Sequence, residues 1–379
     1  MTAADSRIAS AGFLSKFARK TLRYPPTEDN VDTFCDFLLS HLRENSYDVL
    51  FPVHDMDLIP IARRRHLFEP LVRMVLPPQR AFETVLDKGR TASLAREVGI
   101  PTPETFTIDS LEELSSLPGR LTYPVVVKPR TQLRWTDNKE AVVSLVGPEN
   151  YVVSGKSLTC TFHLIHERSP YPIVQERVTG NGAGVAAIFN QGEPRVLFSY
   201  RRLHEYPLSG GPSTLRISTE EPKLKKYAEM LLRALRWHGV AMVEFKVDDR
   251  TGQAWLIEVN GRFWGSLALP IAAGIDFPYL VYQLASQGDC PSVWLYRAGV
   301  MARWLIPGEA LWLASSFRSD PSKIPGILKE FLTMRGIHYD YESFEDPLPA
   351  FGALLSSFVD GFAVLRGKRS PIGEYLSAG

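Results

Sequence analysis

The most chemically informative stretch of this 379-residue chain is GVAMVEFKVDDRTGQAWLIEVNGRFWGS, residues 239–266. Its pattern predicts two strands joined by the turn DDRTG. Side chains alternate along a strand, so Glu258, Asn260 and Arg262 share one face of the second strand. When the two strands pair, Glu244 on the first strand faces the same space. Mg²⁺ binds proteins through one or two carboxylates and completes its shell with water and phosphate oxygens. The stretch therefore predicts a magnesium site, with Mn²⁺ as the alternative ion.

A simpler explanation is that these charges are solvated residues on the outer face of a hairpin. The position of Glu258 inside the apolar run WLIEVN argues against it. Burying an acid among apolar neighbours costs several kcal/mol unless a cation or a hydrogen-bond donor offsets the charge. The functional interpretation is therefore favoured.

Two further segments carry weaker signals. YPVVVKPR places Lys128 at the carboxyl end of an apolar strand, where a lysine either reaches the surface or contacts a ligand. IVQERVTGNGAGVAAIF runs into Gly180, Gly182 and Gly184. These glycines either let the backbone approach a ligand or form a flexible hairpin loop. The residues alone leave both alternatives open.

The elements that would position these residues alternate between helices and strands. A helix at 31–42, a buried parallel strand at 47–53 and a helix at 59–71 predict a β/α module, with the polar turn 54–57 at the carboxyl edge of its sheet. The later pattern predicts helices at 88–99, 222–237 and 348–369, and strands at 123–128, 172–177, 185–189, 196–200, 241–247 and 254–260. A parallel opening followed by hairpins indicates α/β and α+β modules.

Composition narrows the class of protein. The chain has 43 Lys+Arg against 42 Asp+Glu, a formal net charge of +1, with 22% charged and 45% hydrophobic residues. These values are typical of a folded globular protein and argue against a disordered chain or one that coats nucleic acid. No apolar stretch approaches the ~20 residues of a transmembrane helix. Three widely separated cysteines predict neither a disulfide framework nor a zinc site. A cytoplasmic setting is expected.

In their order along the chain, these segments resemble the ATP-grasp enzymes, most closely the single-copy relatives of the carbamoyl-phosphate synthase large subunit. The resemblance covers residue 87 to about residue 288, and EFK…LIEVNGRFWGS is its most specific part. It implies an ATP-grasp fold, in which two α+β subdomains clamp the nucleotide, after a shortened Rossmann-like module and before a C-terminal extension. The expected boundaries are 1–86, 87–175, 176–289 and 290–379.

The resemblance also implies roles for single residues. Lys88 and Lys128 are similar to the two basic residues that contact ATP phosphates. The segment Gln175, Glu176, Arg177 and Val178 resembles the hinge that contacts the adenine. Three residues match the ligands of the metal that bridges the phosphates: Glu244, Glu258 and Asn260.

On the substrate side, Arg262 matches the arginine that steadies the acyl-phosphate or its carboxylate precursor. The segment 201–217 resembles the substrate-side segment of the relatives, in which Arg202 is the expected catalytic contact, and Arg201 and Arg216 are further candidates for binding an anion.

The activity that the resemblance implies is an ADP-forming ligase. ATP phosphorylates a carboxylate, and an amine or similar nucleophile then displaces phosphate, so small-molecule carboxylates and amines are the expected partners. The loop after Lys128 lacks the usual flap glycines, and the N-terminal module is short. These departures leave a second function open, a degenerate ATP-grasp protein that binds nucleotide or a partner without turnover. Three roles stay open for the segment after Gly288: it caps the site, it forms a homodimer, or it docks on a surface.

Overall fold

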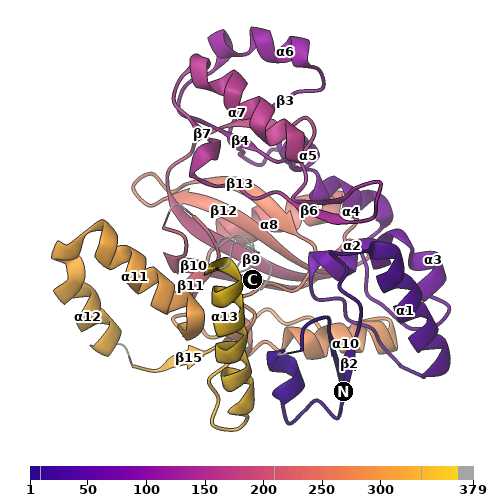
Figure 1. Cartoon of the computed structure of the whole chain (residues 1–379). Coiled ribbons are helices and arrows are strands. Elements are labelled where there is room, and N and C mark those ends of the chain that lie inside the picture. Colours follow the sequence, from indigo (N-terminus) through magenta and orange to yellow (C-terminus); the bar gives the residue numbers. More distant parts are fainter. Residues whose placement is uncertain (9, 209, 334, 366–379) are drawn as a thin grey trace.

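A computed structural model describes residues 1–8, 10–208, 210–333 and 335–365. Figure 1 shows a small lobe at the top, a large central sheet, and helices from the two ends of the chain on either side of it. The small lobe and the large sheet come from consecutive parts of the chain. The space between them is where the sequence predicts the site.

The central element is a seven-stranded sheet with the strand order β13-β12-β9-β10-β11-β14-β15. Neighbouring strands are antiparallel except β14 and β15, which are parallel. The strands are β9 (Asn181–Asn190), β10 (Glu193–Glu205), β11 (Ser213–Thr219), β12 (Gly239–Asp248), β13 (Gln253–Asn260), β14 (Met301–Arg303) and β15 (Ile337–Tyr339). The four strands predicted between residues 185 and 260 are therefore confirmed. The segment after residue 289 adds two strands to the same sheet.

Helices cover both faces of this sheet and bury its apolar residues. Helices α4 (Gln79–Leu86), α5 (Lys88–Glu97) and α8 (Pro222–Ala234) pack on one face. Helices α9 (Ala268–Ala273) and α10 (Phe277–Gln287) pack on the other. The apolar residues of α8 recur every three or four positions, which places them on one side of the helix. The helices predicted at 88–99 and 222–237 are thus confirmed, and they hold the large sheet rigid beneath the site.

The small lobe is a four-stranded sheet with two helices on one face. Its elements are β3 (Thr105–Thr107), β4 (Val125–Lys128), β7 (Tyr151–Val152), β8 (Ile173–Glu176), α6 (Leu111–Ser116) and α7 (Gly155–Arg168). Val125 and Val127 of β4 pack with the helices. Side chains alternate along a strand, so Lys128 points away from the helices. A hairpin of β5 (Leu133–Trp135) and β6 (Ala141–Val143) follows β4.

The N-terminal part differs from the predicted β/α module. It contains a parallel pair, β1 (Thr2–Asp5) and β2 (Lys20–Arg23), and the helices α1 (Val31–Glu44), α2 (Asp55–Arg63) and α3 (Arg65–Phe68). The strand predicted at 47–53 is wrong, because only Val49 forms a bridge, to Arg73. The Leu50 N–H donates to the Arg73 carbonyl at 2.9 Å, but the pairing goes no further, and Phe51 and Val53 are exposed where a buried strand was predicted. The helix predicted at 59–71 is divided between α2 and α3.

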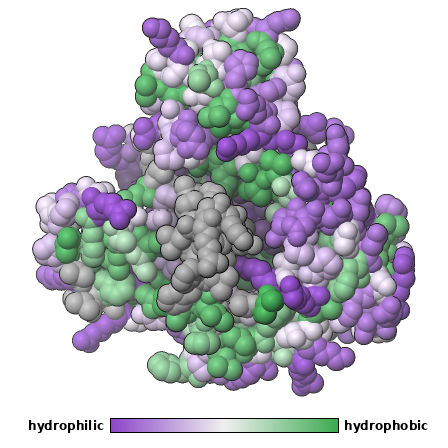
Figure 2. Space-filling view, in the orientation of Figure 1, coloured by the Kyte–Doolittle hydropathy of each residue, from purple (hydrophilic) through white to green (hydrophobic). Residues whose placement is uncertain are grey.

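The C-terminal part adds the helices α11 (Ala310–Ser319), α12 (Ile324–Thr333) and α13 (Leu348–Leu365). The helix predicted at 348–369 is confirmed as far as residue 365, and its basic end lies outside the described residues. Figure 2 shows hydrophobic residues gathered over α11 and α12, on the left of the view. Among the described residues, no helix has the length and apolar character needed to cross a lipid bilayer.

Candidate functional site

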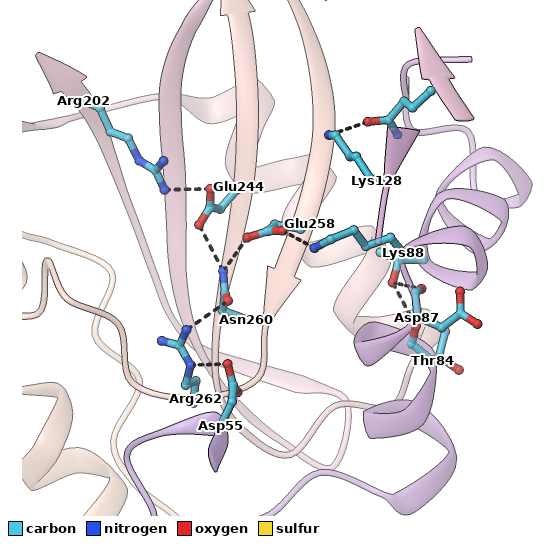
Figure 3. A network of polar contacts seen from close by, with 12 residues as sticks. Asp55, Thr84, Asp87, Lys88, Lys128, Arg202, Glu244, Glu258, Asn260 and Arg262 are labelled. Carbon is cyan, nitrogen blue, oxygen red and sulfur yellow. Dashed lines mark hydrogen bonds and ion pairs between the residues drawn. The ribbon is translucent and has the colours of Figure 1, made fainter. Parts of the chain in front are cut away.

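A cavity of about 300 Å³ lies between the small lobe and the large sheet. Figure 3 shows charged side chains that point toward one another from both sides of this space. Seven residues that the sequence singled out line the cavity: Lys88, Lys128, Arg202, Glu244, Glu258, Asn260 and Arg262. The fold therefore brings together basic and acidic groups that lie as far apart as 170 positions in the chain.

Two carboxylates stand directly opposite each other at the centre of the site. Glu244 of β12 and Glu258 of β13 are cross-strand partners through a β-bulge between Glu244 and Phe245. The prediction that the two acids face one space is confirmed, and the bulge was not predicted. Like charges at such positions destabilise a sheet unless other groups compensate them. The amide nitrogen of Asn260 donates to Glu244 Oε1 at 3.0 Å and approaches Glu258 Oε1 at 3.5 Å. A hydrogen-bond donor thus occupies the space between the two acids.

Lys88 compensates the charge of Glu258. The side chain of Asp87 accepts hydrogen bonds from the backbone N–H of Gly89 at 2.9 Å and of Arg90 at 3.0 Å, so helix α5 begins at Lys88. The ammonium Nζ of Lys88 lies 2.5 Å from Glu258 Oε2. Burial disfavours the ammonium, but Glu258 raises the pKa of Lys88 above its ordinary value. In turn, Lys88 lowers the pKa of Glu258, which is therefore a carboxylate at neutral pH.

Lys128 extends into the cavity from the end of β4. Its Nζ donates to Gln175 Oε1 at 2.7 Å, and the amide nitrogen of Gln175 donates to Thr105 Oγ1 at 2.8 Å. Burial, followed by the positive charge of Lys88, lowers the pKa of Lys128 to about 8. Lys128 thus carries a charge at neutral pH without a carboxylate bonded to it, and an anionic ligand would stabilise that charge.

Arg202 reaches the acids by crossing the neighbouring strand β9. Its Nη2 lies 2.8 Å from Glu244 Oε2. A Cβ added to Gly184 would lie 2.5 Å from the ring of Tyr200, and one added to Gly182 would lie 2.7 Å from Arg202 Cδ. Gly182 and Gly184 therefore leave room for the side chains of Arg202 and Tyr200 over β9, a role that differs from both alternatives the sequence offered. Residues 181–184 belong to a strand and do not form a flexible loop.

Arg262 is positioned by a residue that sequence reasoning did not assign to the site. Its Nε lies 2.8 Å from Asp55 Oδ2, at the start of α2, and its Nη1 donates to the carbonyl of Phe263 at 2.9 Å. Burial opposes the charge, but Asp55 raises the pKa of Arg262. The polar turn at 54–57 was the only sequence signal for Asp55. Its pairing with Arg262 could not be predicted from a local pattern, because 207 positions separate the two residues.

The four residues predicted as the adenine hinge differ in their contacts with the cavity residues. Gln175 contacts Lys128, whereas Glu176, Arg177 and Val178 do not line the cavity. The guanidinium of Arg177 lies 5.3 Å from the ring of Tyr151, which does line it. These residues stay candidates for the adenine hinge.

The arginines of the substrate-side segment separate in the structure. Arg202 and Arg216 are cross-strand partners and share a face. Arg201 binds Glu221 at 2.6 Å and Asp249 at 3.1 Å. Because side chains alternate along β10, Arg201 points away from the cavity, where we no longer expect it to bind an anion.

Comparisons with known proteins agree with this geometry. A family model described as "ATP-grasp in the biosynthetic pathway with Ter operon" matches residues 173–305. The chain is 30% identical over 233 residues to a D-alanine–D-alanine ligase of Carboxydothermus hydrogenoformans, covering 55% of this chain and 70% of the relative. It is 24% identical over 227 residues to the carbamoyl phosphate synthase large chain of Sulfurisphaera tokodaii, covering 56% of this chain but only 19% of that relative.

Two solved structures are similar in fold. The biotin carboxylase domain of Hydrogenobacter thermophilus 2-oxoglutarate carboxylase, solved with MgADP and bicarbonate, has a TM-score of 0.61 at 13% identity, over 79% of this chain and 67% of that chain. The L-amino acid ligase of Bacillus licheniformis has a TM-score of 0.53 at 22% identity, over 71% of this chain and 64% of that chain. The family match and the D-alanine–D-alanine ligase relative agree with the mixed fold and the opposed carboxylates. The chain therefore belongs to the ATP-grasp superfamily.

Proposed function

We propose that the chain is an ATP- and Mg²⁺-dependent ligase that activates a carboxylate as an acyl-phosphate and couples it to an amine, releasing ADP and phosphate. The main support is the opposed pair of Glu244 and Glu258, set between Lys88 and Arg202 in a cavity between two sheets. The relatives named as D-alanine–D-alanine ligase and L-amino acid ligase support the same class of reaction. We further propose that residues 87–175 and 176–289 are the two subdomains that clamp the nucleotide.

The residues present fit a divalent cation bound together with phosphate. The described part of the chain has no group of three or more His, Cys, Asp and Glu residues arranged as a metal site. Two carboxylates and one amide are nevertheless sufficient for Mg²⁺, which takes its remaining ligands from water and phosphate oxygens. Glu244, Glu258 and Asn260 would hold the ion, and the bound ion would neutralise phosphate charge. The contacts of the Asn260 amide nitrogen with Glu244 at 3.0 Å and Glu258 at 3.5 Å support the proposal, because both acids direct an oxygen into the same space.

In the proposed reaction, a carboxylate oxygen of the substrate forms a bond to the γ-phosphorus of ATP while the bond to the ADP oxygen breaks. The amine nitrogen then bonds to the acyl carbon, the bond from that carbon to the phosphate oxygen breaks, and the nitrogen loses a proton to water. Lys88 and Lys128 would contact the phosphates. Arg262 would hold the carboxylate, and Arg202 would stabilise the oxygens as charge moves. No nucleophile from the protein is required.

Detection of the activated carboxylate tests this proposal. The purified chain would be incubated with ATP, Mg²⁺, a panel of carboxylic acids and hydroxylamine, which converts any acyl-phosphate to a stable hydroxamate. We expect ADP and hydroxamate in equal amounts for at least one acid, and no product after chelation of the metal. Tight nucleotide binding without ADP release for any acid would instead support the non-catalytic alternative, a degenerate ATP-grasp protein.

The lowered pKa of Lys128 predicts how nucleotide affinity depends on pH. The protonated lysine binds phosphate, and with a pKa of about 8 it loses its charge between pH 7 and pH 9. If only the charged form binds, the dissociation constant for MgATP rises about tenfold over this range. The Lys128→Arg variant stays charged and should show little change between these pH values. Calorimetric titrations at pH 7, 8 and 9 check this, and equal pH dependence of the two proteins would contradict it.

A further inference from the structure

Apolar and aromatic side chains line the cavity beside the charged residues of the proposed metal and phosphate site. They come from five separate places in the chain: Tyr200, Met242, Trp264, Trp304 and Tyr341. Neither the metal nor the triphosphate of the proposed reaction needs these side chains, and the candidate adenine contacts lie at residues 175–178. Their function is therefore sought in another ligand.

Trp264 offers both an apolar ring and an unused hydrogen-bond donor. It follows β13 directly, is 4% exposed, and packs edge-on against Phe277 with ring centroids 5.1 Å apart. Its indole Nε1 is buried and has no hydrogen-bond partner within the described residues. A buried donor without a partner costs about 1–3 kcal/mol, so Trp264 contributes to the cavity through its apolar ring.

Trp304 belongs to the segment after residue 289, and the fold fixes its ring. Its backbone N–H donates to the carbonyl of Thr214 at 2.8 Å, which ties it to β11. A Cβ added to Gly308 would lie 2.6 Å from the ring of Trp304, so the backbone passes directly over the ring. The indole is 8% exposed and lines the cavity. A rotation of Trp304 away from the cavity is therefore obstructed.

Tyr341 is held in place by the strand before it. The backbone N–H of Asp340 donates to the carbonyl of Arg303 at 3.1 Å, and the carboxylate of Asp340 forms an ion pair with the buried Arg216. These contacts attach the end of β15 to β14 and β11. Tyr341 and Trp304 both line the cavity and are both fixed by the fold. We call these two side chains the aromatic wall, and their preorganisation reduces the entropy lost when a ligand binds.

We propose, on the basis of the function above, that these apolar and aromatic side chains bind the body of the carboxylate substrate, and that the substrate is a carboxylic acid with a flat apolar ring. Trp304 and Tyr341 are its specificity-determining residues. Aromatic rings gain from apolar burial and from stacking on one another, whereas a short or doubly charged acid would leave this wall without a partner. The carboxylate end would lie toward Arg262.

The test compares ring-bearing acids with aliphatic acids of the same charge, using phenylacetate and 3-phenylpropionate against acetate, butyrate and succinate. Hydroxamate formation gives KM and kcat for each acid at saturating MgATP. We expect the ring-bearing acids to have at least tenfold lower KM. Trp304→Ala should remove this preference while the KM for MgATP stays the same, and Trp304→Phe should restore most of it. Trp294→Ala is the matched control, because Trp294 lies on the same segment, is 51% exposed and does not line the cavity.

Calorimetric binding of the same acids in the presence of MgADP needs no turnover. Binding of the ring-bearing acids that is lost in Trp304→Ala and kept in Trp294→Ala supports the inference even if no acid is activated, which would defeat only the ligase assignment. Tighter binding of acetate or succinate than of phenylacetate would overturn the inference. An unchanged preference in a folded Trp304→Ala protein, verified by its thermal unfolding, would overturn it as well.

Discussion

Replacement of Glu258 by Gln should reduce kcat for hydroxamate formation about 10²–10³-fold, because one charged contact at a site of developing charge contributes about 3–4 kcal/mol. The change keeps the size and shape of the side chain and removes only its charge. Glu258 is the acid whose pKa Lys88 lowers, so it is the carboxylate of the pair that stays fully ionised. Burial raises the pKa of Glu244 in spite of Arg202, so Glu244 takes up a proton more readily than Glu258.

Measurements of ADP binding with and without Mg²⁺ show whether the activity is lost because the variant no longer binds the metal. In the wild-type protein, added Mg²⁺ should strengthen ADP binding. In Glu258→Gln it should have little effect, while metal-free ADP still binds through Lys88 and Lys128. Glu229→Gln is the matched control, because Glu229 is a surface partner of Arg233 on α8. Turnover at the wild-type rate in Glu258→Gln would refute the proposed metal site, provided that circular dichroism shows a native fold.

The sequence predicted only part of the centre of the site. The short turn between two apolar runs pairs Phe245 with Leu256, and in that register Glu244 would face Ile257. A β-bulge between Glu244 and Phe245 shifts the pairing by one residue and brings Glu258 opposite Glu244, which the period of two does not encode. Lys88 and Lys128 were predicted by resemblance, and both line the cavity together with the acids.

Other parts of the molecule depend on contacts that no local pattern encodes. The apolar run at 47–53 has the composition of a buried strand, but the fold places no strand beside it. Asp55 reaches Arg262 across 207 positions. Trp304 and Tyr341 reach the cavity because β14 and β15 extend the sheet beyond β11. The composition of the segment after residue 289 gives no sign of that pairing.

Replacement of Asp340 by Ala should lower the free energy of unfolding by about 3–5 kcal/mol, because it leaves a buried guanidinium without its counter-ion. The side chain of Arg216 is 0% exposed and that of Asp340 is 8% exposed. Two further nitrogens of Arg216, Nε and Nη1, already lack hydrogen-bond partners among the described residues.

The double variant Arg216→Met/Asp340→Leu separates the cost of an unpaired charge from the contribution of the ion pair itself. Replacing a buried pair by apolar residues of similar size is often neutral or stabilising, so this variant should unfold at a higher denaturant concentration than Asp340→Ala. Glu193→Ala, which removes an exposed partner of Arg233, should cost less than about 1 kcal/mol. Denaturation followed by circular dichroism measures all three. If the double variant is no more stable than Asp340→Ala, the stability at this position comes from packing, and the ion pair does not hold the C-terminal segment against the sheet.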